Sequence, residues 1–157
     1  MKKRYYLAYG SNLNVGQMRF RCPTARPLGT AFIEDYELLF KGSRTGSYLT
    51  IEPRSGARVP VAVWEVQEAD EAALDRYEGY PAFYYKKEMD ICYTGLMTGK
   101  ERDVTAFVYI MHEERPLGIP TQFYVRTCLD GYRIFGFDGE YIHTAVERSR
   151  EGMQDEG

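Results

Sequence analysis

The hydrophobic positions of this chain form short strand-like segments over its first two thirds and take helical spacing toward its end. An apolar, aromatic run over residues 5–9 predicts a buried first strand. Further strands are expected over residues 27–34, 36–40, 48–52, 59–66, 83–93 and 103–111. Helices are expected over residues 14–20, 68–77, 121–134 and 140–149. Strands followed by helices predict an α+β domain, with the sheet closed into a small barrel.

Glycine and polar residues mark the expected breaks between these elements. Residues 34–35 separate two strands, and residues 41–46 are expected to form a glycine-punctuated loop. The polar residues 54–57 are expected to turn the chain into a hairpin that pairs residues 48–52 with residues 59–66. Residues 59–66 are largely apolar on both faces, which is typical of a central or barrel strand.

The composition favours one folded globular domain. The 157 residues, of which 44% are hydrophobic and 15% aromatic, are enough to build a core. Because no linker or repeat divides the chain, we expect a single domain over residues 1–150 and a flexible polar tail over residues 151–157. The net charge of −3, without a long run of one sign, argues against nucleic acid or a membrane surface as a partner.

The cysteines and the basic start of the chain bear on its location. Cys22, Cys92 and Cys128 lie far apart and fit neither a disulfide framework nor a zinc site, which favours a reducing cytoplasm. The apolar run behind the basic start is too short for a signal peptide, and no transmembrane segment is expected. The sequence has no phosphate loop, dinucleotide fingerprint or metal-ligand cluster, so no cofactor is expected.

The break after the first strand is a candidate binding site. The stretch Tyr9-Gly10-Ser11-Asn12-Leu13 ends a strand just before a helix begins. Such a turn leaves backbone N–H groups unpaired and pointing one way, which suits a carboxylate or an amide carbonyl oxygen. Gly10 would let a ligand approach the backbone closely. An ordinary turn is the alternative that this stretch alone leaves open.

Glu78 is the candidate general base. It follows Leu74 by four residues, so the two share a helix face that should point toward the core. Burial among aromatic neighbours, the negative end of the helix dipole and nearby Asp75 would each raise its pKa. A carboxylate with a raised pKa suits proton transfer near neutral pH. The alternative is a half-exposed glutamate paired with Arg76 or Lys86.

Taken together, the two stretches resemble the γ-glutamylcyclotransferase-like (AIG2-like) family. The residues that carry the resemblance are Tyr9 to Leu13, Leu74-Asp75-Arg76-Tyr77-Glu78-Gly79, Tyr84-Tyr85-Lys86, Pro120, Tyr124, Gly131 and Tyr141-Ile142. The resemblance therefore covers nearly the whole chain. It implies a small mixed fold in which a twisted, barrel-like sheet is flanked by helices.

The resemblance also implies an activity and a site. Members of the family convert a γ-glutamyl amine compound into 5-oxoproline and a free amine. The Tyr9–Leu13 loop is then expected to bind the substrate through backbone amides, and Glu78 to act as acid and base. Substrates differ among members, so the leaving amine stays open, as does the oligomeric state. The reaction needs no cofactor, because the substrate's own α-amine attacks its γ-carbonyl.

Other residues are weaker candidates. Tyr84 and Tyr124 are expected to line the cavity and to hydrogen-bond the substrate or the general base, with simple aromatic packing as the alternative. Arg44 has the charge to pair with a substrate carboxylate, although a solvated loop arginine is favoured. His112 and His143 are both expected at the surface.

Two other functions remain open from the sequence. One is a non-catalytic module on the same fold that binds a small carboxylate ligand without turnover; Glu78 argues against it, because a buried negative group would weaken such binding. The other is an interaction domain that uses the tyrosine-rich surface over residues 80–85. A deep pocket that holds Glu78 would argue against this second alternative.

Overall fold

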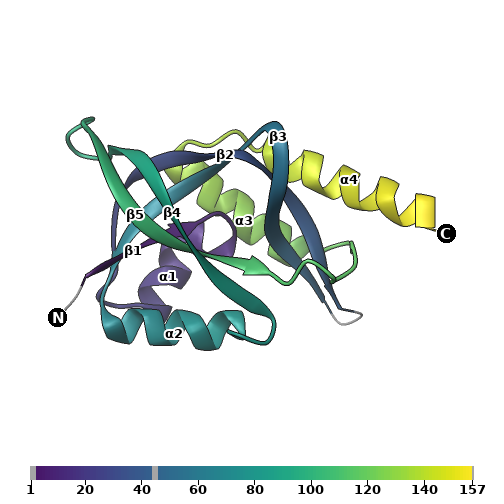
Figure 1. Ribbon diagram of the computed structural model, residues 1–157, viewed down its shortest axis with the longest axis horizontal. Helices are drawn as coiled ribbons and strands as arrows, with labels where there is room; N and C mark the ends of the chain where they lie inside the picture. The colour runs from purple at the N-terminus through teal and green to yellow at the C-terminus, as the bar shows by residue number, and fades with distance from the viewer. Residues whose placement is uncertain (1–2, 44–45, 157) are drawn as a thin grey trace.

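The protein is a small closed barrel with helices packed around it (Figure 1). The computed structural model describes residues 3–43 and 46–156. Within these residues the strands are β1 (Arg4–Ala8), β2 (Arg26–Ser43), β3 (Gly46–Val66), β4 (Tyr84–Gly95) and β5 (Glu101–Met111), which follow the barrel order β1-β3-β2-β4-β5. β1 and β5 are parallel and the other pairs antiparallel. The predicted α+β class and barrel-like mixed sheet are confirmed.

Helices cover the barrel on several sides. They are the short 3₁₀ turn η1 (Ser11–Leu13), α1 (Val15–Arg21), α2 (Glu68–Glu78), α3 (Gln122–Phe135) and α4 (Glu140–Glu156). In Figure 1, α1 and α2 lie below the barrel and α3 lies behind it. α4 extends away from the barrel on the right of the view. α4 is tied to β2 by a 3.1 Å hydrogen bond from the Ser149 hydroxyl to the carbonyl oxygen of Phe40.

The helix ends follow the expected capping chemistry. The Asn14 side chain accepts a hydrogen bond from the Gln17 N–H at 3.2 Å, which starts α1 where the sequence predicts. The Asp70 carboxylate accepts the Gln67 N–H at 3.0 Å and stabilises the first turn of α2. Gly79 ends α2 in the left-handed conformation, with φ of 67°.

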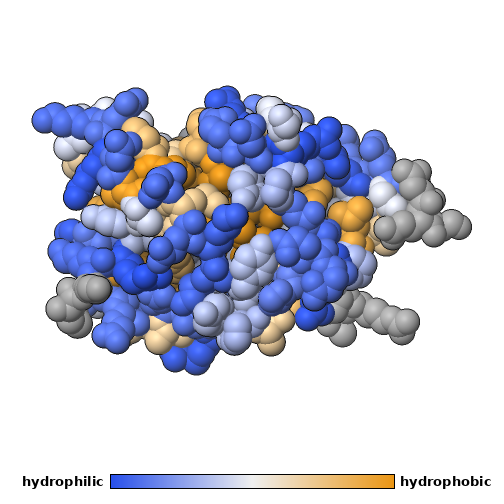
Figure 2. All heavy atoms as spheres, viewed as in Figure 1, coloured by the Kyte–Doolittle hydropathy of each residue, from blue (hydrophilic) through white to orange (hydrophobic). Residues whose placement is uncertain are grey.

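The barrel closes where β2 meets β4. These strands pair only through Gly29 with Gly95 and Thr30 with Thr94, and they diverge farther along. A Cβ atom at Gly29 would lie 2.2 Å from the carbonyl oxygen of Thr94, so a residue without a side chain is required for closure. In Figure 2, most of the face shown is hydrophilic, and hydrophobic residues gather in the hollows between the elements.

The predicted hairpin around residues 54–57 is wrong. β3 runs without a break through these residues, and its first half pairs with β2, as in Leu38 with Ile51. The register between the two strands shifts here instead, because Asp35 of β2, with φ of 62°, lies opposite residues 54–57 of β3. The Gly56 N–H donates to Asp35 Oδ1 at 3.0 Å across this bulge. A bulge and a turn use the same residue types, which explains the error.

Two further boundaries differ from the sequence prediction. Residues 41–43 and 46 continue β2 and β3 instead of forming a loop, and residues 44–45 lie outside the described part. Helix α4 continues to Glu156 instead of ending at Ser149. The flexibility expected for residues 151–157 therefore stays a prediction.

Candidate active site

A cavity of about 370 Å³ lies where η1, the end of α2 and the barrel strands meet. Its lining is mostly aromatic and comprises Tyr6, Tyr9, Gly10, Ser11, Asn12, Tyr48, Leu49, Tyr77, Glu78, Phe83, Tyr84, Tyr109 and Tyr124. The structure thus brings Glu78 and the Gly10 turn, which are far apart in sequence, to one cavity. Of the predicted site residues, only Leu13 does not line it.

Leu13 belongs to the core. Its side chain is fully buried, and a Cβ atom added to Gly131 of α3 would lie 2.5 Å from Leu13 Cβ. The close approach of α3 to η1 therefore depends on a glycine. Leu13 therefore anchors the turn to the core and does not line the cavity.

The η1 turn leaves its first backbone N–H groups without an acceptor inside the turn. Its first internal hydrogen bond runs from the Leu13 N–H to the Gly10 carbonyl oxygen at 3.0 Å. The N–H groups of Ser11 and Asn12 come earlier and have no acceptor inside the turn. Both residues line the cavity, so this turn can supply donors to a bound oxygen atom.

Gly10 has little free space around its Cα atom. Its φ of −130° is not left-handed, so the turn requires no positive φ at this position. A Cβ atom here would lie 3.3 Å from the Tyr124 hydroxyl oxygen and 3.5 Å from Leu49 Cδ1. A larger side chain would fill the cavity beside these two residues.

Glu78 is the last residue of α2, and its carboxyl group lies in the cavity wall. The residue as a whole is half-buried, but desolvation of the carboxyl group raises its pKa to about 8, while the positive charge of Arg21 acts to lower it. A carboxyl group with this pKa accepts and releases a proton readily near neutral pH.

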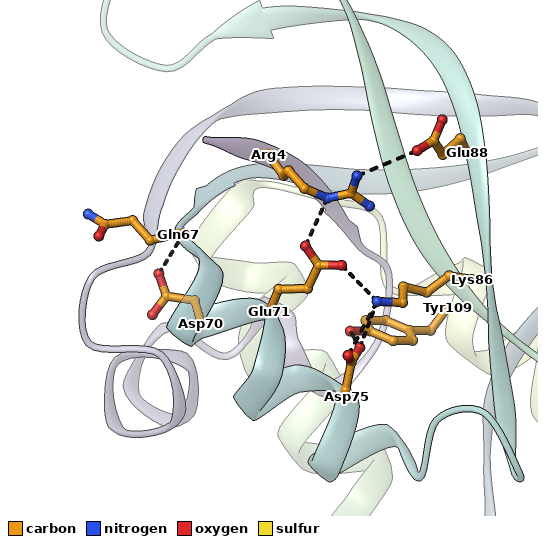
Figure 3. Close-up of polar contacts among 8 residues, drawn as sticks. All are labelled: Arg4, Gln67, Asp70, Glu71, Asp75, Lys86, Glu88 and Tyr109. Atoms are coloured by element: carbon orange, nitrogen blue, oxygen red, sulfur yellow. Dashed lines mark hydrogen bonds and ion pairs between the residues drawn. The ribbon is translucent and has the colours of Figure 1, made fainter. Parts of the chain in front are cut away.

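Asp75 does not contribute to the raised pKa of Glu78, although the sequence predicts that it would. Its carboxylate is paired with other residues (Figure 3). The Tyr109 hydroxyl donates to Asp75 Oδ1 at 2.6 Å, and Lys86 Nζ lies 3.0 Å from the same oxygen. Lys86 Nζ also lies 2.7 Å from Glu71 Oε2. Lys86 is therefore committed elsewhere, and within the described residues Glu78 forms no ion pair. The sequence-based alternative, an ion pair of Glu78 with Arg76 or Lys86, is wrong.

The cavity tyrosines are anchored on main-chain atoms. The Tyr9 hydroxyl donates to the carbonyl oxygen of Tyr109 at 2.7 Å, and the Tyr84 hydroxyl to that of Leu49 at 2.8 Å. The Leu49 N–H donates to the Tyr124 hydroxyl oxygen at 3.2 Å, which leaves the Tyr124 proton available to another acceptor. Burial raises the pKa of all three of Tyr9, Tyr84 and Tyr124 well above its ordinary value, so they stay neutral donors.

The side chains of the η1 turn are used for structure. Asn12 Nδ2 donates to the Tyr6 hydroxyl at 2.9 Å, and Asn12 Oδ1 accepts from Arg21 Nη1. The Ser11 hydroxyl lies 2.9 Å from the Tyr77 hydroxyl. These side-chain contacts fix the conformation of the turn.

Sequence reasoning missed several residues at the site. Tyr6, Tyr48, Leu49 and Tyr109 line the cavity, and Arg21 lies beside it. Tyr6 and Tyr109 meet because β1 pairs with β5, a contact that no local pattern reveals. Tyrosine in strands carries some signal, since buried hydroxyl groups need partners.

The remaining candidates lie elsewhere. His143 is exposed, and His112 is half-buried, with Nε2 2.8 Å from the carbonyl oxygen of Pro81. Arg44 lies outside the described residues. Across residues 3–43 and 46–156, no cluster of three histidine, cysteine or acidic side chains is arranged to hold a metal ion. Nor does any helix in that part of the chain have the length and apolar character needed to span a bilayer.

The fold and the site define a class: small α+β barrel proteins with an acid-bearing, tyrosine-lined cavity. A family model described as Gamma-glutamyl cyclotransferase, AIG2-like matches residues 6–126, and the chain belongs to this family. The sequence-based resemblance is thereby confirmed.

Individual relatives agree with this assignment. The chain is 28% identical over 145 residues to a Gamma-glutamylcyclotransferase from Homo sapiens, across 87% of this chain and 73% of the relative. A Bos taurus protein of the same name is 28% identical over 144 residues, with the same coverage. A solved structure described as Gamma-glutamyl cyclotransferase superposes with a TM-score of 0.76 and 26% identity, covering 95% of this chain and 87% of that chain.

Proposed function

We propose that this protein cyclises a small γ-glutamyl amine compound to 5-oxoproline and a free amine, with Glu78 as the proton-transferring group. The observation that carries the proposal is a carboxyl group of raised pKa in the same cavity wall as the N–H groups of Ser11 and Asn12. The family to which the chain belongs supports the same chemistry.

The reaction begins when the substrate folds back on itself in the cavity. Its neutral α-amine attacks the γ-carbonyl carbon, which forms one C–N bond and closes a five-membered ring. Glu78, as the carboxylate, accepts the proton that this nitrogen sheds. Holding the two reacting groups of one molecule in contact supplies a large part of the rate enhancement. The cavity volume of about 370 Å³ is in the range for a small ligand.

The tetrahedral intermediate carries a negative oxygen that requires donors. We assign this role to the backbone N–H groups at the start of η1, on the wall of the same cavity as Glu78. The protonated Glu78 then donates its proton to the nitrogen of the leaving amine, and the original γ-glutamyl amide C–N bond breaks. The proton count balances, because the proton taken from one nitrogen is returned to the other.

The decisive experiment is incubation of the purified protein with a panel of γ-glutamyl compounds that differ in the leaving amine. Formation of 5-oxoproline, measured by liquid chromatography and mass spectrometry, is expected for at least one of them. Glu78→Gln should slow it by roughly two to four orders of magnitude, and Glu68→Gln, an exposed position on the same helix, should leave it unchanged. Binding of these compounds without 5-oxoproline formation would instead identify a non-catalytic binding module.

A further inference from the structure

Arg21 connects the two parts of the site. It is the last residue of α1, it is half-buried, and its Nη1 donates to Oδ1 of Asn12 in η1. Its guanidinium carbon lies 3.4 Å from the centre of the Tyr77 ring, next to Glu78 in sequence. One side chain therefore bridges the turn that carries the backbone donors and the helix end that carries the carboxyl group.

Both contact partners of Arg21 are themselves held in place. Asn12 Nδ2 donates to the Tyr6 hydroxyl at 2.9 Å, so Arg21 supplies the donor for the other end of the same amide. The Tyr77 hydroxyl lies 2.9 Å from the Ser11 hydroxyl, although the Tyr77 residue is 44% exposed. A planar guanidinium stacked on an exposed ring restricts that ring and shields one of its faces.

Arg21 is also the charge that acts on Glu78. Its positive charge lowers the pKa of Glu78, against the desolvation that raises it to about 8. The other titratable groups around the cavity are tyrosines, and burial raises the pKa of Tyr6, Tyr9, Tyr84, Tyr109 and Tyr124, so they stay neutral. The nearby carboxylates of Asp75 and Glu71 both form ion pairs with Lys86.

We propose that Arg21 is a positioning residue that holds the η1 turn against the end of α2 and keeps a positive charge beside Glu78. The guanidinium group contacts Asn12 and Tyr77 and does not line the cavity, so it acts through these partners and not on the substrate. This inference rests on the proposed function, because it assigns Arg21 a part in the reaction of Glu78.

Two substitutions separate charge from position. Arg21→Gln keeps a planar hydrogen-bond donor but removes the charge, whereas Arg21→Lys keeps the charge but loses the planar stack. Arg21→Gln should move the acidic limb of the kcat/KM profile about 0.5 to 1 pH unit upward, because the carboxylate becomes harder to form. Arg21→Lys should leave the limb in place and raise KM about three- to tenfold through a looser turn.

Controls separate this role from a general structural one. Arg19→Gln, at an exposed position on the same helix, should change neither the pH profile nor KM. Tyr77→Leu removes the stacking surface but leaves the charge of Arg21 in place, so it should raise KM without moving the limb. Equal loss of kcat in both Arg21 variants, with an unmoved limb and unchanged KM, would overturn the proposal.

A second measurement does not depend on turnover. The carboxyl carbon of Glu78 can be titrated by NMR in isotopically labelled parent protein and in Arg21→Gln, with Glu78→Gln to assign the signal. The titration midpoint should be higher in Arg21→Gln than in the parent protein. If the parent forms no 5-oxoproline, the proposed function fails, while an unchanged midpoint overturns the charge role of Arg21 by itself.

Discussion

The hydroxyl group of Tyr109 donates a 2.6 Å hydrogen bond to Oδ1 of Asp75, one helical turn before Glu78 (Figure 3). Tyr109 lines the cavity from β5, and Asp75 belongs to α2. This hydrogen bond therefore holds the C-terminal end of α2 against β5 in the barrel wall. Because Lys86 holds the same carboxylate, the connection also reaches β4.

Tyr109→Phe should lower the free energy of unfolding by about 1.5–3 kcal/mol, because one partly buried hydrogen bond to a charged group is lost. Urea denaturation measures this change. Tyr132→Phe is the matched control, since the buried Tyr132 hydroxyl has no partner within the described residues. Its removal should leave stability unchanged or slightly higher. An equal loss in both variants would mean that the bond to Asp75 contributes nothing.

Glu78→Gln should reduce turnover by roughly two to four orders of magnitude, the usual contribution of a general base. The amide keeps the size of the side chain but accepts no proton. Affinity for a non-cyclising γ-glutamyl analogue should change little, as calorimetric titration would measure. Near-normal turnover in Glu78→Gln would remove this residue from the mechanism.

Glu78 should make stability depend on pH. Its pKa is about 8 in the folded protein, against an ordinary value of 4.5, so the folded state binds the proton more tightly. The stabilising contribution is therefore fully present below about pH 4.5, and it is lost as the pH rises through about 8. Thermal unfolding of the parent and of Glu78→Gln across this range should show a steeper decline in the parent. Parallel curves would contradict the raised pKa.

Substitutions in the η1 turn should separate backbone from side-chain binding. Gly10→Val should weaken binding of the same analogue most, because its side chain would enter the space beside Tyr124 and Leu49. Ser11→Ala should be milder, since the backbone N–H remains and only the bond to Tyr77 is lost. Glu78→Gln should have the smallest effect. If Ser11→Ala is as damaging as Gly10→Val, the hydroxyl group binds the ligand.

Gly29→Ala should destabilise the barrel by about 1–3 kcal/mol, the usual cost of overpacking. The added Cβ would meet the Thr94 carbonyl oxygen at 2.2 Å, where β2 and β4 close the sheet. Gly16→Ala in α1 is the control, because its Cβ would come no closer than 3.5 Å to the Asn14 side chain. That change should be neutral or stabilising by about 0.5–1 kcal/mol.

Local chemistry made much of the fold predictable. The Asn14 cap and the Gly79 end cap of α2 could be placed because each depends on neighbours in sequence. The apolar faces of residues 59–66 correctly indicated a barrel strand. The pairing of β3 with β2 was missed, because a bulge at Asp35 and a turn over residues 54–57 have the same composition.

The residues of the candidate site likewise fall into those that local sequence could predict and those that it could not. Glu78 and the Gly10 turn could be singled out because a carboxylate on a core-facing helix position and a glycine turn are visible in the sequence. Arg21 could not, because its role depends on how α1 crosses the ends of η1 and α2. Leu49 was invisible for another reason, since it contributes main-chain atoms that every residue type possesses.

The main-chain groups of Leu49 link the cavity to the stability of the barrel. In its first half, β3 pairs with β2, and Leu49 is only 1% exposed, so its N–H and C=O groups need partners inside the protein. Tyr124 and Tyr84 occupy those two groups with their hydroxyls. The two tyrosines that line the cavity therefore also satisfy buried main-chain groups of the barrel. The cavity cannot be reshaped at these two positions without a cost in stability, because a buried N–H or C=O group without a partner destabilises the folded state.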